Sequence, residues 1–177
     1  MHSDLRGDPS AEQRAASLFS LGDLPSWQSI QHLLGQVVGV NLSLLDSSGN
    51  QTLPPCRISG FCSEFVHYLP AVPAEPPNDC PAQAVAYYLT QNEPFYQCPH
   101  GLNFTVVKIA EDAFWVIGPI LVGVRQSQEI YTQNCLNNGI DPELFCDRVR
   151  EIKVFSHQGI RNLLNFCARL SSFLISH

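Results

Sequence analysis

The sequence has few charged residues, and basic residues are the scarcest among them. Charged residues make up 15% of the chain, well below the roughly one quarter found in average globular proteins. Ten Lys and Arg residues stand against sixteen Asp and Glu residues, which gives a net charge of -6. Binding to nucleic acid relies on several Lys and Arg side chains that contact phosphates. Because no basic cluster is present, we do not expect direct binding to nucleic acid.

Long apolar runs are also missing. A transmembrane helix needs about 20 consecutive apolar residues, whereas the longest apolar stretch, Ala113–Val124, is interrupted by two glycines and a proline. Residues 1–14 are polar and lack the apolar core of a signal peptide. We therefore expect a cytoplasmic protein that makes no contact with a membrane.

The signatures of common catalytic classes are absent from the sequence. It contains no glycine-rich phosphate loop, no Gly-x-Ser-x-Gly elbow and no His-Glu-x-x-His motif. Cys98 and His100 could form a nucleophile and base pair, but no third group that would orient the histidine can be named. We therefore do not expect the protein to be an enzyme.

The apolar residues that are present suffice for one well-packed domain. They make up 45% of the 177 residues, and a chain of this length supports one core more readily than two. Residues 1–24 are mostly polar, so we expect a flexible N-terminal arm there. Residues 25–177 are then expected to form a single domain that ends in an amphipathic helix.

The spacing of the apolar residues predicts both helices and strands. Gly118-Pro119 is expected to form a bulge or edge in the longest strand, and Asp141 is expected to cap a helix. The predicted helices cover Trp27–Val37, part of Ser59–Leu69, Pro81–Gln91, Tyr131–Asn137, a stretch after Asp141, and Ile160–Ile175. The predicted strands cover Val40–Asp46, Phe95–Cys98, Phe104–Ile109 and Phe114–Val124.

The segment from Cys56 to Cys80 is irregular. Four prolines within Ala71–Pro81 exclude a regular element there, so this stretch reads as a Cys- and Pro-rich helical insertion. The order of the elements favours an α+β fold. We expect an antiparallel sheet flanked by helices that cover one of its faces, the layout of PAS and GAF sensor domains.

Four of the seven cysteines lie in the middle third of the sequence. Cys56, Cys62, Cys80 and Cys98 are separated by 5, 17 and 17 residues, and they fall in predicted loops or at the ends of predicted elements. Thiolates that converge there could hold zinc or an iron–sulfur cluster, although no Cys-x-x-Cys pair is present. Two other interpretations remain open, namely small buried core residues and a thiol–disulfide redox switch.

The other three cysteines are expected to be core residues. Cys146 follows Phe145 in a predicted helix, and Cys167 lies on the apolar face of the last helix. Cys135 is interpreted in the same way, since cysteine that is not in a disulfide is among the most buried residue types.

Aromatic residues gather in the same middle third and predict a pocket. Small-molecule sites are mostly apolar and carry a few polar groups. Phe61, Tyr96 and Phe104 are the strongest candidates to line such a pocket. His100 could act as a further metal ligand or could hydrogen-bond a bound anion. The alternative is that these aromatic side chains only fill the core.

One stretch of the sequence resembles a known family. Phe95-Tyr96-Gln97-Cys98-Pro99-His100-Gly101-Leu102 precedes two strands, the second of which ends in Ile-Gly-Pro-Ile-Leu-Val-Gly. This pattern resembles the PocR sensory domain. The leading helix, the first strand with its Asp-x-x-Gly turn, the Phe61-Cys62 pair, Cys80 and the closing helix are similar too. The resemblance covers roughly residues 25–175.

The resemblance implies a PAS-like module that binds a small molecule in bacterial transcription regulators and histidine kinases. It implies a cavity between sheet and helices, and a ligand such as a hydrocarbon derivative, for example a short diol. Cys62, Cys80 and Cys98 are the best candidates for the site, with Cys56 as a fourth. Signalling would pass through the terminal helices, either packed on their own sheet or paired in a homodimer. The output kinase or regulator is not identified.

A rival interpretation belongs to another class. Zinc or an iron–sulfur cluster bound by the cysteines could be structural or redox-active, with no organic ligand. The cysteine-lined site of the sensor could itself hold such a metal or cluster. Visible absorbance of anaerobic protein favours a cluster, and colourless protein with one zinc per chain favours a structural metal. Colourless, metal-free protein with a bound small molecule favours the organic-ligand sensor.

Overall fold

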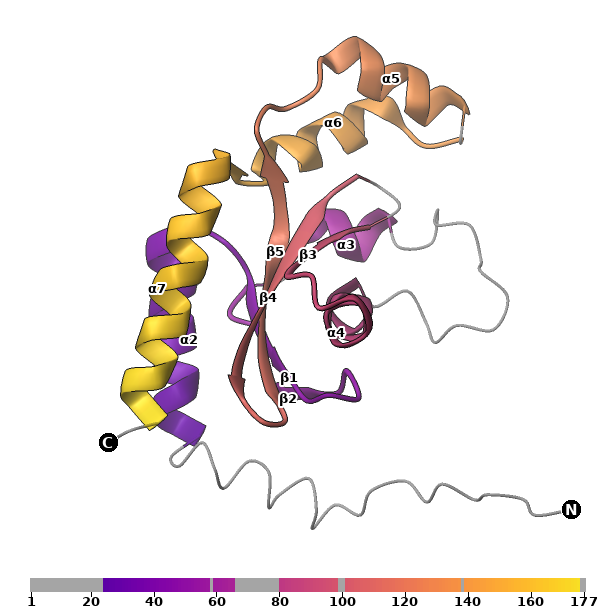
Figure 1. The fold of residues 1–177 in the computed structure, drawn as a ribbon. Helices are drawn as coiled ribbons and strands as arrows, with labels where there is room; N and C mark the ends of the chain where they lie inside the picture. The colour runs from indigo at the N-terminus through magenta and orange to yellow at the C-terminus, as the bar shows by residue number, and fades with distance from the viewer. Residues whose placement is uncertain (1–23, 58, 66–79, 99–100, 138, 176–177) are drawn as a thin grey trace, which may run out of the picture.

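The computed structural model describes residues 24–57, 59–65, 80–98, 101–137 and 139–175 (Figure 1). Nearly all of the predicted N-terminal arm, residues 1–24, lies outside this range. Residues 66–79, which hold most of the predicted irregular insertion, and residues 99–100 lie outside it as well.

The described residues form helices and strands in nearly the predicted order. The helices are α2 (Leu24–Val38), α3 (Gly60–Phe65), α4 (Cys80–Gln91), α5 (Gln128–Asn137), α6 (Pro142–Glu151) and α7 (His157–Ile175). The strands are β1 (Leu42–Leu45), β2 (Gln51–Leu53), β3 (Phe95–Gln97), β4 (Asn103–Ala110), β5 (Ala113–Val122) and β6 (Val154–Phe155). None of these helices is both long and apolar enough to cross a membrane.

The strands form one sheet in the order β2-β1-β5-β4-β3, and neighbouring strands in this series run antiparallel. The short β6 pairs parallel with the end of β5. This α+β arrangement is consistent with the predicted PAS-like sheet. The sequence predicted neither β2 nor β6, because each is only two or three residues long and depends on its partner strand.

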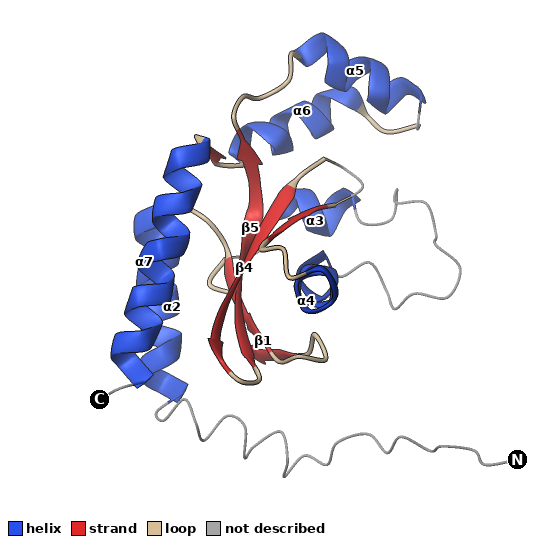
Figure 2. Ribbon diagram, in the orientation of Figure 1, coloured by secondary structure: helices blue, strands red, loops and turns tan. Residues whose placement is uncertain are grey.

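Helices cover both faces of the sheet, which corrects the expectation of one covered face. In Figure 2, α2 and α7 lie together on one side of the sheet, and α3 and α4 lie on the other. We name the two buried clusters after these helices. The α2/α7 core includes Trp27, Leu34, Leu44, Trp115, Ile160 and Cys167. The α3/α4 core includes Phe61, Ala84, Phe104, Phe114, Phe145 and Val149.

The central strand β5 supplies both cores because successive side chains point to opposite faces. Phe114 and Val116 enter the α3/α4 core, whereas Trp115 and Ile117 enter the α2/α7 core.

The first strand, β1, is also buried along its whole length. The half-buried pattern expected for it was wrong. Even its serine, Ser43, is buried.

The predicted irregularity at Gly118 is present in β5. Register with β4 shifts between Asn103 and Thr105, opposite Gly118 and Pro119. A Cβ atom on Gly118 would lie 2.7 Å from the Phe104 ring. Glycine is therefore required for this ring to lie directly against the backbone of β5.

Candidate functional site

The predicted pocket-lining aromatic residues lie on one face of the sheet. Phe61 from α3 and Phe104 from β4 are buried in the α3/α4 core, and Tyr96 from β3 packs against it. The Phe61 ring meets the ring of Phe145 from α6 edge to face, with centroids 5.1 Å apart. The fold therefore brings these distant aromatic residues together, while His100 lies outside the described residues.

Tyr96 supplies a polar group at the edge of this core. Its hydroxyl donates a hydrogen bond of 2.6 Å to Oε1 of Gln83 on α4. Its ring lies 6.5 Å from the ring of Phe104 and 5.7 Å from that of Tyr87. Tyr96 thus fixes β3 to α4 on the side of the α3/α4 core.

A tight turn accounts for the glycine in the Cys-x-x-Gly-Leu stretch. The Gly101 N–H donates to the Cys98 carbonyl at 2.8 Å, and the Cys98 N–H donates to the Leu102 carbonyl at 2.8 Å. Gly101 has a φ of +78°, a conformation that favours glycine. The turn leaves Cys98 and Leu102 buried in the α3/α4 core.

Three of the four candidate metal-binding cysteines lie in or against the same core. Cys80 and Cys98 are buried members of the α3/α4 core, and Cys62 packs against it. Cys56 lies on the other side of the sheet, against the α2/α7 core. Its Sγ accepts a hydrogen bond of 3.1 Å from the Leu42 N–H, because the loop after β2 brings it back to the start of β1.

The described residues contain no group of three or more His, Cys, Asp or Glu side chains placed to hold a metal ion. Cys56 in particular is separated from the other three cysteines by the sheet. The remaining cysteines fit the core interpretation, since Cys135, Cys146 and Cys167 are all buried. Burial raises the pKa of the Cys167 thiol to about 11.

A pocket of about 160 Å³ opens beside the α3/α4 core. It lies between the turn that joins β3 to β4, the end of β5 and the helix pair α5 and α6. Its lining residues are Gln97, Gly101, Leu102, Asn103, Leu121, Val122, Val124, Gln126, Tyr131, Phe145 and Val149. No charged side chain is among these described lining residues.

None of the residues predicted for the site is among these lining residues, and Phe61, Tyr96 and Phe104 lie in or against the neighbouring core instead. Gln97, Gly101 and Leu102 belong to the stretch that carries the family resemblance, so that stretch could have pointed to them. Tyr131 and Val149 carry no local signal, because their place in the lining depends on how α5 and α6 fold back toward the sheet.

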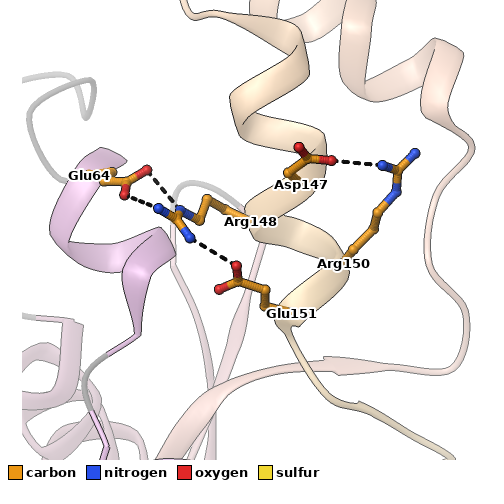
Figure 3. Close-up of polar contacts among 5 residues, drawn as sticks. All are labelled: Glu64, Asp147, Arg148, Arg150 and Glu151. Atoms are coloured by element: carbon orange, nitrogen blue, oxygen red, sulfur yellow. Dashed lines mark hydrogen bonds and ion pairs between the residues drawn. The ribbon is translucent and has the colours of Figure 1, made fainter.

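An ion pair holds α3 against α6 beside this core (Figure 3). Arg148 donates through Nε to Oε2 of Glu64 at 2.9 Å and through Nη2 to Oε1 at 2.5 Å. It also donates to Glu151 at 2.9 Å. The hydrogen bonds from Arg148 lower the pKa of the Glu64 carboxyl below its ordinary value. The pair fixes the helix that presents Phe61.

Comparison with known families identifies the domain. The model of one family, the sensory domain found in PocR, matches residues 20–177. The chain belongs to the PocR sensory domain family. Membership gives this PocR domain a sensory role and implies that it binds a small molecule. No curated protein and no solved structure matches the chain significantly.

α2 and α7 both pack into the α2/α7 core on the same side of the sheet (Figure 1). Both helices expose large apolar side chains, and neither contains an acidic residue. The exposed apolar residues of the two helices are Leu33, Val37, Phe166, Phe173 and Ile175.

Proposed function

We propose that this PocR domain is a bacterial cytoplasmic sensor that binds a small, uncharged molecule in the pocket beside the α3/α4 core. The observation that supports this proposal is the pocket's position and lining. The pocket borders the α3/α4 core, which contains Phe61, Cys98 and Phe104. Phe145 belongs both to this core and to the pocket lining. Apolar walls with a few convergent polar groups are typical of small-molecule sites.

The lining favours a neutral ligand that forms hydrogen bonds. The polar side chains of Gln97, Asn103, Gln126 and Tyr131 are amides and a phenol, which pair well with hydroxyl or amide groups. A charged ligand would lose its hydration without an opposite charge, which is costly. At about 160 Å³, the pocket is smaller than the roughly 300 Å³ at which typical ligand pockets begin. A short diol is therefore a suitable ligand.

A second pocket, of about 350 Å³, lies between α5 and α6 but is less suitable. Its charged lining residues include Glu143, Asp147 and Arg150, and Arg150 already pairs with Asp147 at 2.7 Å. None of its lining residues belongs to the α3/α4 core, whereas Leu102, Leu121, Phe145 and Val149 of the smaller pocket do. We therefore assign the ligand to the smaller pocket.

In this proposal, Cys62, Cys80 and Cys98 are apolar residues in or against the α3/α4 core beside the pocket, rather than metal ligands. The exposed apolar face of α2 and α7 is the output surface, through which two copies pair. Ligand binding shifts the equilibrium between two arrangements of these helices only by its differential affinity for them. This sensory role is non-enzymatic.

Thermal unfolding in the presence of small probes tests the proposal. Propane-1,2-diol and ethane-1,2-diol are the neutral probes, and lactate and 1-amino-2-propanol are charged controls of similar size. A ligand that binds only the folded state raises the unfolding midpoint as its concentration increases. We expect this increase with a neutral probe and not with the charged controls.

Two variants connect the result to the pocket. Gln126→Ala removes a lining amide and should weaken the increase, whereas Gln133→Ala alters an exposed residue of α5 that does not line the pocket. A midpoint that no neutral probe shifts, together with no small molecule detected in native mass spectra of the purified protein, would overturn the proposal. Equal effects of both variants would remove the pocket assignment.

A further inference from the structure

The linker between β5 and α5 lines the pocket and also contacts the end of α6. Val124 and Gln126 both line the pocket. Between them, Arg125 reaches the end of α6, where its Nη2 donates to the carbonyl of Arg150 at 3.1 Å and to that of Ile152 at 2.6 Å. One short stretch of backbone thus joins the pocket to the end of α6.

These two carbonyls need a donor. The last carbonyls of a helix have no partner inside the helix, and the C-terminus carries partial negative charge. α6 ends at Glu151, with Ile152 as its C-cap in an extended conformation. The guanidinium of Arg125 therefore satisfies a carbonyl of the last turn and the carbonyl of the cap, and it complements the helix dipole.

The chain passes from one core to the other directly after this cap. Ile152 is buried in the α3/α4 core, and Ile160, near the start of α7, is buried in the α2/α7 core. Between them, β6 pairs parallel with β5, and backbone hydrogen bonds lie at both ends of this pairing. The Leu121 N–H donates to the Lys153 carbonyl at 2.9 Å, and the Gly123 N–H donates to the Phe155 carbonyl at 2.8 Å.

We propose that Arg125 is the positioning residue that couples the ligand pocket to the output helix α7. This inference rests on the proposed function. A ligand packed against Val124 and Gln126 fixes the linker, and Arg125 then holds the Arg150 and Ile152 carbonyls in place. The cap fixes β6 and the first turn of α7. Without the guanidinium, a change in the pocket no longer reaches α7.

Hydrogen exchange of the full chain, followed by mass spectrometry of peptides covering residues 152–160, measures this coupling. Val149→Leu adds a methylene to the pocket and Val149→Ala removes two methyl groups, so both variants change the pocket without requiring a ligand. We expect each of them to change exchange in residues 152–160 when Arg125 is present. In the Arg125→Met background, the same substitutions should leave this exchange unchanged.

Arg125→Met alone should accelerate exchange in residues 152–160 by about tenfold, the effect of losing roughly 1.4 kcal/mol of charged hydrogen bonding. Arg125→Lys keeps the charge and should recover part of the protection. Arg150→Met is the matched control, because it removes the contacts with Asp147 and Gln128 and leaves the Arg125 bonds to backbone in place. It should preserve the effect of the Val149 variants.

Additivity decides between coupling and simple helix capping. If the effects of the Val149 and Arg125 substitutions on residues 152–160 add, Arg125 is only a cap and the inference is wrong. The result is independent of the diol experiment, since no ligand is used. If the proposed function alone fails, the neutral probes leave the unfolding midpoint unshifted. The Val149 and Arg125 effects on exchange in residues 152–160 then still do not add.

Discussion

Glu64 and Arg148 form a two-point ion pair across the interface between α3 and α6. α3 is a helix of six residues, too short to be stable alone. Its position over the α3/α4 core therefore depends on contacts such as this pair and the packing of Phe61 on Phe145.

Glu64→Gln should lower the unfolding midpoint by about 2 °C near pH 7, as expected for a partly exposed pair. The pKa of Glu64 is lowered in the folded protein by the hydrogen bond from Arg148. The stabilisation is therefore complete above the ordinary pKa of 4.5 and is lost as the pH falls through the folded value. Scanning calorimetry from pH 7 to pH 3 should show the wild-type and Glu64→Gln midpoints converging.

The control Glu151→Gln changes the more exposed pair and should lower the unfolding midpoint less. If the wild-type and Glu64→Gln midpoints stay equally far apart across this pH range, the prediction is contradicted.

Gly35→Ala should destabilise the domain by about 2 kcal/mol through overpacking. A Cβ atom on Gly35 would overlap the Cys56 Sγ atom and would lie 3.1 Å from the Val40 carbonyl oxygen. Cys56→Ala removes the sulfur, although it also removes the acceptor of the Leu42 N–H. In denaturant titrations, the double variant should therefore lose less stability than the sum of the two single variants. A strictly additive loss would show that the sulfur is not the obstacle.

Cys167 should resist alkylation in the native protein. Burial raises its pKa to about 11, so almost no thiolate is present at pH 8. Iodoacetamide followed by peptide mass spectrometry should modify Cys167 only after unfolding, while the half-buried Cys56 reacts sooner. The same shift means that stability linked to this thiol is present below pH 9 and is lost as the pH rises toward 11. Equal labelling rates for the two cysteines would contradict this prediction.

Metal analysis of anaerobically purified protein should find well below one equivalent of zinc or iron. If a stoichiometric metal is found, the position of each cysteine predicts which variant releases it. Cys98→Ala should lower the metal content, and Cys56→Ala should not, because Cys56 lies across the sheet. A full equivalent lost only with Cys98→Ala would replace the organic-ligand proposal with the metalloprotein alternative.

Features set by local chemistry could be predicted from the sequence. Asp141 accepts a hydrogen bond of 2.9 Å from the Glu143 N–H at the start of α6, as its capping role requires. The apolar spacing of Ile160–Ile175 likewise places α7, and Gly118 marks the irregularity in β5. Each of these depends on residues close together in the sequence.

Features set by distant packing could not be predicted. Ser43 and Thr105 are polar and yet buried. In the sequence, their strands therefore have the alternating pattern of strands with one face toward solvent. The covering of both faces was missed for this reason. None of the predicted site residues lines the pocket, because Gln126 and Val149 approach the β3–β4 turn only after α5 and α6 have packed.

Alternating side chains on β5 also have a consequence for how relatives of this domain can diverge. Neighbouring residues such as Val116 and Ile117 belong to separate interiors, so a substitution that reshapes one interior leaves the other intact. Under the proposed function, relatives can therefore change their ligand preference on one side of the sheet while the surface formed by α2 and α7 on the other side is retained.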